Sequence, residues 1–140
     1  MAYDTNNVFA KILRGELPAH KVYEDADTFA LMDIMPRSEG HVLVIPKGHV
    51  RNIFDASGDQ LAACMRTIQK VAAAAMKAFA ADGITLLQAN ESAGGQVVFH
   101  LHFHVMPRWQ GKPLGPPAAR SEKPELLAAN AEKIRKALAV

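Results

Sequence analysis

Residues 97–107 read Val-Val-Phe-His-Leu-His-Phe-His-Val-Met-Pro, and this stretch decides the fold. Three histidines alternate with apolar residues, and in a strand a period of two places alternate side chains on one face. We therefore expect a strand over residues 97–106 that ends at Pro107. One face would carry the imidazoles and the other would carry core residues, namely His100, His102 and His104 against Phe99, Leu101, Phe103 and Val105.

The remaining elements are expected on both sides of this strand. Short apolar segments bounded by turn residues predict strands over residues 20–23, 28–33, 41–45 and 84–88. Capping residues and helical spacing predict helices over residues 6–14, 58–82 and 121–138, with an extended connector over 111–120. The first three strands are joined too closely for a crossover helix. We therefore expect an α+β fold, an antiparallel sheet of about five strands with the long helix packed on it and short terminal helices.

The composition is that of one globular domain. The chain has 140 residues, 49% of them hydrophobic and 21% charged, and its formal net charge is +2. These values exclude a disordered or collagen-like chain, and the charge predicts no nucleic-acid partner. Cys64 is the single cysteine, so no intrachain disulfide or four-thiolate zinc site can form. With no secretory pattern and no apolar run of about 18 residues, we expect a cytoplasmic protein without a membrane partner.

The histidine row is compatible with a zinc-dependent hydrolase. Histidines at alternate strand positions can ligate zinc, and three imidazoles plus water form a catalytic coordination set. Three such residues spread over roughly 13 Å at a rise of about 3.3 Å per residue, too far to converge on one ion. A site made of His100 and His102 and completed by His41 or His49 is geometrically easier.

A phosphate site is the competing interpretation. Gly94 and Gly95 form a glycine-rich loop just before the histidines, where backbone N–H groups can form an anion-binding nest, and Asn90 adds an amide donor. Neutral imidazole is a competent nucleophile at phosphorus near neutral pH. The loop and the histidines together favour covalent chemistry on a phosphate.

The segment His-Leu-His-Phe-His-Val-Met, residues 100–106, resembles the signature of the histidine triad (HIT) family of nucleotide-binding hydrolases and transferases. Three more segments resemble the family in its order and spacing, and they are NVFAKILRGELPAHKVYED at 7–25, DIMPRSEGHVLVIPKGHV at 33–50 and NESAGGQVVFHLHFH at 90–104. The resemblance covers residues 8–109 and is closest to the bacterial branch. It implies one HIT domain over residues 1–140, with a connector and final helix at 110–140.

The resemblance implies a reaction at the α-phosphorus of a purine nucleoside monophosphate derivative, of the phosphoramidase or dinucleoside polyphosphate hydrolase type. His102 would be the nucleophile, water would hydrolyse the nucleotidyl-His102 intermediate, and no metal or cofactor would be needed. His100 would orient the neighbouring imidazole with support from His41, and Asp33 would accept from the ribose hydroxyls. The remaining contacts would be His104, Asn90, Gly95, Gln96 and Val97 around the phosphate, and Val8, Phe9, Ile12 and Ile34 around the base. A homodimer joined through the long helix and a strand is also implied.

Three departures from the family pattern matter. Many bacterial relatives bind zinc through a Cys-x-x-Cys pair in the first helix, but the matching residues here are Asn7 and Ala10, so we expect no structural zinc. Val97 stands where some members have a serine that assists the phosphate or leaving group. The segment 110–140 resembles bacterial tails, so leaving-group specificity does not transfer.

Simpler explanations stay open for several of these residues. Asp33 could only start the following turn, and His41 could be a buried histidine with satisfied hydrogen bonds. Phe9 and Ile12 could be plain core, and His49 fits a surface or structural role better than a catalytic one. At the level of function, a nucleotide-binding module with little turnover is the alternative to an enzyme.

Overall fold

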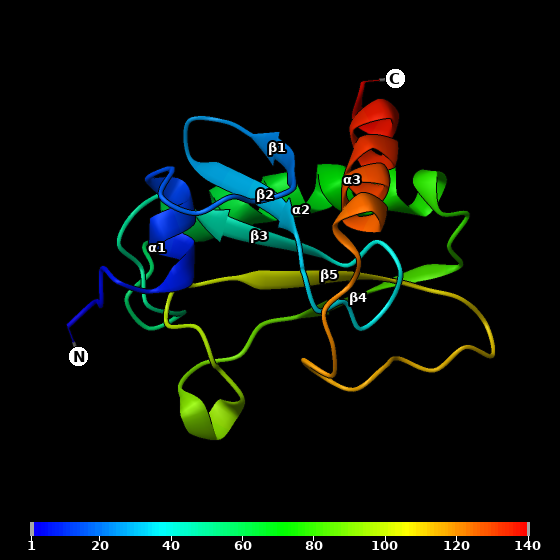
Figure 1. The fold of residues 1–140 in the computed structure, drawn as a ribbon. Helices are drawn as coiled ribbons and strands as arrows, with labels where there is room; N and C mark the ends of the chain where they lie inside the picture. The colour runs from blue at the N-terminus through cyan, green and yellow to red at the C-terminus, as the bar shows by residue number, and fades with distance from the viewer. Residues whose placement is uncertain (1, 140) are drawn as a thin grey trace.

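The sheet of the computed structural model has five antiparallel strands in the order β1-β2-β3-β5-β4, within described residues 2–139 (Figure 1). The strands are β1 (Lys21–Glu24), β2 (Thr28–Met32), β3 (Val42–Pro46), β4 (Gly83–Leu87) and β5 (Phe103–Arg108). β1, β2 and β3 form a meander, and β5 inserts between β3 and β4. The predicted α+β class with an antiparallel sheet of about five strands is confirmed.

The helices are α1 (Val8–Leu13), α2 (Gly58–Ala78) and α3 (Pro124–Leu138), with a short 3₁₀ helix η1 (Ser92–Gly94). The expected capping box of α2 is present, because the Ser57 hydroxyl accepts from the Gln60 N–H and the Gln60 amide accepts from the Ser57 N–H. α2 ends at Ala78, earlier than expected, since Ala80 adopts a left-handed backbone with φ of 47°. Among residues 2–139, no helix is both long and apolar enough to cross a membrane.

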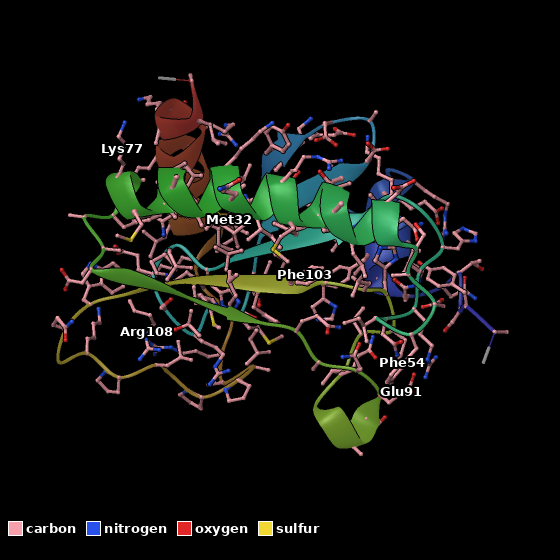
Figure 2. All side chains as sticks on the ribbon, turned by 180° about the vertical axis from the view of Figure 1, so that it is seen from behind. Met32, Phe54, Lys77, Glu91, Phe103 and Arg108 are labelled. Carbon is pink, nitrogen blue, oxygen red and sulfur yellow. The ribbon has the colours of Figure 1, made fainter. Side chains whose placement is uncertain are left out.

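Each face of the sheet has its own apolar cluster. α2 runs across one face, as Figure 2 shows from behind, and packs there on side chains that include Val44, Leu101 and Val105. α3 packs against α2 and β1 at the edge of the same layer. On the opposite face, Phe9 of α1 packs with Leu31, Leu43 and Ile45. His104 of β5 lies opposite Leu43 of β3, so the His104 side chain is on the sheet face that α1 covers.

The expected strand over residues 97–106 is wrong in its first half, since β5 begins only at Phe103. The register that pairs Val44 with Phe103 would place Leu101 opposite Pro46, which has no N–H to continue the ladder. The chain bends instead, and Leu101 donates its N–H to the Val50 carbonyl at 2.8 Å. His100, His102 and His104 therefore do not lie on one face of a single strand. Leu101, Phe103 and Val105 are core residues as expected. Phe99 is not in that core, and Cζ of Arg51 lies over its ring, 4.2 Å from the centroid of the Phe99 ring.

Pro107 does not end β5, which continues to Arg108. β3 begins at Val42, opposite Val105, so at Pro107 the strand has a neighbour only on the β4 side. A missing N–H is tolerated where one edge of a strand is unpaired.

Gly40 is a test of the packing between the loop before β3 and the end of α2. Its φ is +82°, and a Cβ there would lie 2.4 Å from Cε2 of the buried Phe79. We expect Gly40→Ala to lower the free energy of unfolding by about 2–4 kcal/mol, from the left-handed backbone and the clash together. Gly15→Ala is the matched control, since Gly15 has φ of +79° and no neighbouring atom within 4 Å. In urea denaturation, Gly15→Ala should lower the free energy of unfolding by only about 1–2 kcal/mol. Equal losses in the two variants would contradict the packing argument.

Candidate active site

The orientation of His102 is set by the peptide group two residues before it. Its Nδ1 lies 2.7 Å from the carbonyl oxygen of His100. A carbonyl only accepts hydrogen bonds, so Nδ1 carries the proton and Nε2 keeps its lone pair. The His102 ring packs edge-on against Phe9 and His104, with ring centroids 5.0 and 5.1 Å away. The Nε2 lone pair of this buried ring is therefore suited to nucleophilic attack.

His41 and His104 form a second pair whose tautomers are fixed by their partners. Nδ1 of His41 accepts from the backbone N–H of Arg37 at 3.0 Å, so the His41 proton lies on Nε2. This Nε2 lies 2.9 Å from Nδ1 of His104 and donates to it. The proton of His104 therefore lies on its Nε2, where it can be donated to a bound anion.

Burial keeps these imidazoles neutral near pH 7. Desolvation, together with repulsion from neighbouring histidines, lowers the pKa of His41 to about 3 and the pKa values of His100 and His104 to about 4. Desolvation also lowers the pKa of His102, although its hydrogen bond to the His100 carbonyl opposes that change. A neutral imidazole at pH 7 is the form that a nucleophile requires.

Asp33 follows β2 and takes part in both a turn and the histidine cluster. Its Oδ1 accepts from the Met35 N–H at 2.8 Å, an Asx turn. Its Oδ2 lies 3.4 Å from Nε2 of His41 and 4.0 Å from Nδ1 of His104. Desolvation raises the pKa of Asp33, opposed by the Met35 N–H. One oxygen thus has the turn role, while the other lies beside the histidines.

The positions of the family's Cys-x-x-Cys pair do not fit a zinc ion. Asn7 uses its side chain to cap α1, since Oδ1 accepts from the Ala10 N–H at 2.9 Å and Nδ2 donates to the Asp4 carbonyl at 2.7 Å. Ala10 has no ligand atom. These two residues stabilise the start of α1 and offer zinc no thiolate.

A three-residue cluster of Asp33, His41 and His104 also has to be considered, because its ligand atoms lie within 4.8 Å of one another. Nε2 of His41 carries the proton in this cluster, since its Nδ1 accepts from a backbone N–H. A metal at that nitrogen would require an imidazolate. The donor set therefore suits a hydrogen-bond relay better than a metal ion.

The zinc site considered for His100 and His102 has the same difficulty. Nε2 of His100 donates to the Pro46 carbonyl at 2.8 Å, and its Nδ1 accepts from the Tyr3 hydroxyl. Both nitrogens of His100 are thus committed to hydrogen bonds. His49 is exposed and stacks on Tyr3, which agrees with the structural role expected for it.

The loop before the histidines is held by its own polar network. Gln96 is 3% exposed, and its amide oxygen accepts from the Asn52 side chain and the Glu91 N–H. Its amide nitrogen donates to the Arg51 and Val98 carbonyls. Arg51 forms two hydrogen bonds to the Glu91 carboxylate, at 2.7 and 2.8 Å. The Gln96 side chain is fully used in building the loop, and its N–H donates to the Glu91 carbonyl, so Gln96 has no free donor for an anion.

The nest predicted from Gly94 and Gly95 is not present. The N–H groups of Gly94 and Gln96 donate to the Glu91 carbonyl, and that of Gly95 donates to the Ser92 carbonyl, each at 3.0 Å. Within residues 2–139, none of the hydrogen bonds uses the N–H of Val97, which remains available for an anion. Asn90 accepts from the Ile53 N–H at 2.8 Å and pairs with the Gln88 amide, so it too is mainly a loop residue.

The predicted base wall is divided between core and surface. Phe9 is 6% exposed and packs both in the apolar cluster with Leu31, Leu43 and Ile45 and against His102. The same ring therefore serves the core and the site. Ile12 packs at the edge of that cluster. Val8 and Ile34 are 39% and 53% exposed, which leaves them accessible to a ligand.

The structure thus brings together His102, His104, His41, Asp33 and Phe9, whereas His100 reaches His102 through its carbonyl group instead of its ring. The sequence analysis missed Arg37, Arg51, Asn52, Glu91 and Tyr3. Arg37 acts through a backbone N–H, which no side-chain pattern shows. An arginine and a glutamate 40 residues apart carry no local signal of pairing either.

Comparison with known proteins identifies a single family. A model of the HIT domain matches residues 14–111. The adenosine 5'-monophosphoramidase hnt1 of Schizosaccharomyces pombe is 34% identical over 119 residues, covering 78% of this chain and 86% of that protein. The adenylylsulfatase HINT3 of Arabidopsis thaliana is 41% identical over 101 residues, covering 72% of this chain and 51% of that protein.

The fold has an equally clear counterpart among solved structures. A Hit-like protein involved in cell-cycle regulation from Bartonella henselae, crystallised with an unknown ligand, has a TM-score of 0.94 and 51% sequence identity. The alignment covers 98% of this chain and 99% of that one. This bacterial neighbour and the domain match confirm the resemblance predicted from residues 100–106, and the chain belongs to the HIT domain family.

Proposed function

We propose that this chain is a hydrolase of purine nucleoside monophosphate derivatives, of the AMP phosphoramidate or adenylate type, and that it works through a covalent nucleotidyl-His102 intermediate. The observation that carries the proposal is the fixed tautomer of His102, with Nδ1–H on the His100 carbonyl and a lone pair on Nε2. The names of the phosphoramidase and adenylylsulfatase relatives support the substrate class.

The first step forms a bond between Nε2 of His102 and the α-phosphorus, and it breaks the bond from phosphorus to the leaving group. The departing leaving group takes one proton from solvent, and the water that attacks in the second step returns one proton to solvent. His104 donates its Nε2–H to a phosphate oxygen, aided by the Val97 N–H, and so balances the charge that develops there. In the second step water attacks phosphorus, the P–N bond breaks, and the nucleoside monophosphate is released with a neutral His102.

Asp33 and the apolar residues position the nucleoside. Oδ2 of Asp33 accepts from the ribose hydroxyls, while Phe9, Ile12, Val8 and Ile34 surround the base. The alternative is a nucleotide-binding module with little turnover. Val97 favours this alternative, because it is 83% exposed and has no hydroxyl at the position where some family members have an assisting serine.

We also propose that the protein is a cytoplasmic homodimer. β4 is an edge strand whose Leu86 is 48% exposed, and Met65 of α2 is 47% exposed. α2 is the long helix through which the family resemblance implies pairing, and β4 offers an exposed edge for the strand that it implies. The single buried Cys64 suits a reducing compartment.

His102→Ala should abolish both the covalent adduct and turnover, with a loss of about 1,000-fold or more, since it removes the nucleophile. A slow adenylyl donor and an alkaline quench preserve the phosphoramidate for peptide mapping. His104→Ala should slow turnover but still yield the adduct on His102. Label on His100 or His104, or a His102→Ala protein with most of its activity, would refute the assignment. If no residue of the protein becomes labelled although AMP binds tightly, the result would favour the binding module.

Asp33→Ala should weaken AMP binding by about 1.5–3 kcal/mol, or about 10-fold to 150-fold in Kd, because hydrogen bonds to a charged acceptor are lost. Asp33→Asn is the matched variant, since it keeps an oxygen for the Met35 turn and removes the charge. Both should leave turnover of a ribose-free phosphoramidate nearly unchanged. If calorimetry finds that Asp33→Ala binds AMP as tightly as the parent, the residue serves the turn alone.

Purified protein should contain no stoichiometric zinc, because Asn7 and Ala10 replace the cysteine pair and no soft ligand set is available. Elemental analysis and activity after chelation measure this directly. One equivalent of zinc, lost together with activity on chelation, would overturn the metal-free mechanism in favour of the zinc-dependent hydrolase.

A further inference from the structure

Tyr3 lies ahead of α1 and outside the residues that match the HIT domain model. Its hydroxyl oxygen is 2.5 Å from Nδ1 of His100. Its ring stacks on the His49 ring with centroids 4.6 Å apart and planes 9° apart. The same ring meets His100 edge-on, with centroids 5.7 Å apart. Tyr3 therefore touches the first histidine of the triad from a segment distant in sequence.

The direction of this hydrogen bond follows from the other side of the His100 ring. Nε2 of His100 lies 2.8 Å from the Pro46 carbonyl oxygen, which can only accept. The His100 proton is therefore on Nε2, and Nδ1 is a bare acceptor. The Tyr3 hydroxyl must donate to it. His100 is fully buried, so both of its nitrogens depend on these two partners.

His100 in turn controls His102 through the main chain. The His100 carbonyl accepts the Nδ1 proton of His102 at 2.7 Å and so determines which His102 nitrogen keeps a lone pair. The peptide group that carries this carbonyl lies outside any strand and has one main-chain hydrogen bond, from the Leu101 N–H to the Val50 carbonyl at 2.8 Å. That bond holds one edge of the peptide group, and the His100 ring, held between Tyr3 and Pro46, is its second anchor.

We propose that Tyr3 is a positioning residue for the nucleophile: its hydroxyl fixes the tautomer and orientation of His100, whose carbonyl holds His102 with Nε2 ready for attack. The inference rests on the proposed function, in which His102 attacks phosphorus. Tyr3 contacts no substrate in this scheme, and it acts on kcat through His100.

Tyr3→Phe removes one oxygen atom and keeps the ring on His49. We expect kcat for an AMP phosphoramidate to fall about 10-fold, as for one unmade buried hydrogen bond, with KM changed less than about twofold. The adduct should still map to His102. Long-range ¹H–¹⁵N NMR spectra supply a readout that a merely structural role would not move. In the parent His102 should be a single Nδ1–H tautomer, and in Tyr3→Phe it should be a mixture.

Tyr23→Phe is the matched control, because Tyr23 is the second of the two tyrosines and its hydroxyl contacts Asp25 and Lys70 instead of a histidine. It should keep the parent kcat and the parent His102 tautomer. A double-variant cycle adds a test of the route. In a His100→Ala background, Tyr3→Phe should cost less than about twofold in kcat, since its partner is absent.

Three results would overturn the proposal: a parent-like kcat in Tyr3→Phe, an unchanged His102 tautomer beside a reduced kcat, or a full additional loss in the His100→Ala background. Failure of the proposed function looks different. In that case the parent itself gives no adduct on His102, whereas the NMR comparison of parent and Tyr3→Phe still reports whether the hydroxyl fixes the tautomers.

Discussion

The hydrogen bond from Nδ1–H of His102 to the carbonyl of His100 is the interaction on which the site depends. It requires the chain to leave the extended conformation, because in a regular strand that carbonyl would point to a neighbouring strand. The bend occurs where the ladder runs out, opposite Pro46, whose carbonyl instead accepts from the His100 ring. A single proline thus ends the pairing and supplies the acceptor that secures the bent segment.

Desolvation is the second constraint, and it outweighs every attractive interaction on the histidines. The rings of His102 and His104 are 5.1 Å apart, as are those of His41 and His104. Two positive charges at that separation repel by about 3 kcal/mol at an effective dielectric constant of about 20. The cluster is therefore stable only while its imidazoles are neutral. That state is also the one in which each ring has one donor and one acceptor to pass along the chain of hydrogen bonds.

The sequence predicted the fold well because periodic patterns report local structure. Ser57 and Gln60 predicted the start of α2 through their capping-box pattern. The short connections between β1, β2 and β3 predicted that these strands are antiparallel neighbours. The prediction of a strand over residues 97–102 was wrong because alternation of apolar residues does not by itself ensure strand pairing. Pairing also depends on the residue opposite, which here would be Pro46, a residue without an N–H. Of the site, His102, His104, His41 and Asp33 were identified and lie together. Gly94 and Gly95 were misread as a nest, since glycine spacing does not show that their N–H groups turn inward.

The histidine relay does not stop at His41, because its backbone donor is itself held by the C-terminal connector. The Arg37 carbonyl accepts from the Gly115 N–H at 2.8 Å, and Nε of the Arg37 side chain donates to the Gly115 carbonyl at 2.9 Å. A Cβ at Gly115 would lie 3.0 Å from the Arg37 carbonyl oxygen, so this close approach favours glycine. The connector thereby holds Arg37, the residue whose N–H sets the His41 tautomer. The His104 proton, in consequence, depends on a segment that lies outside the matched HIT domain.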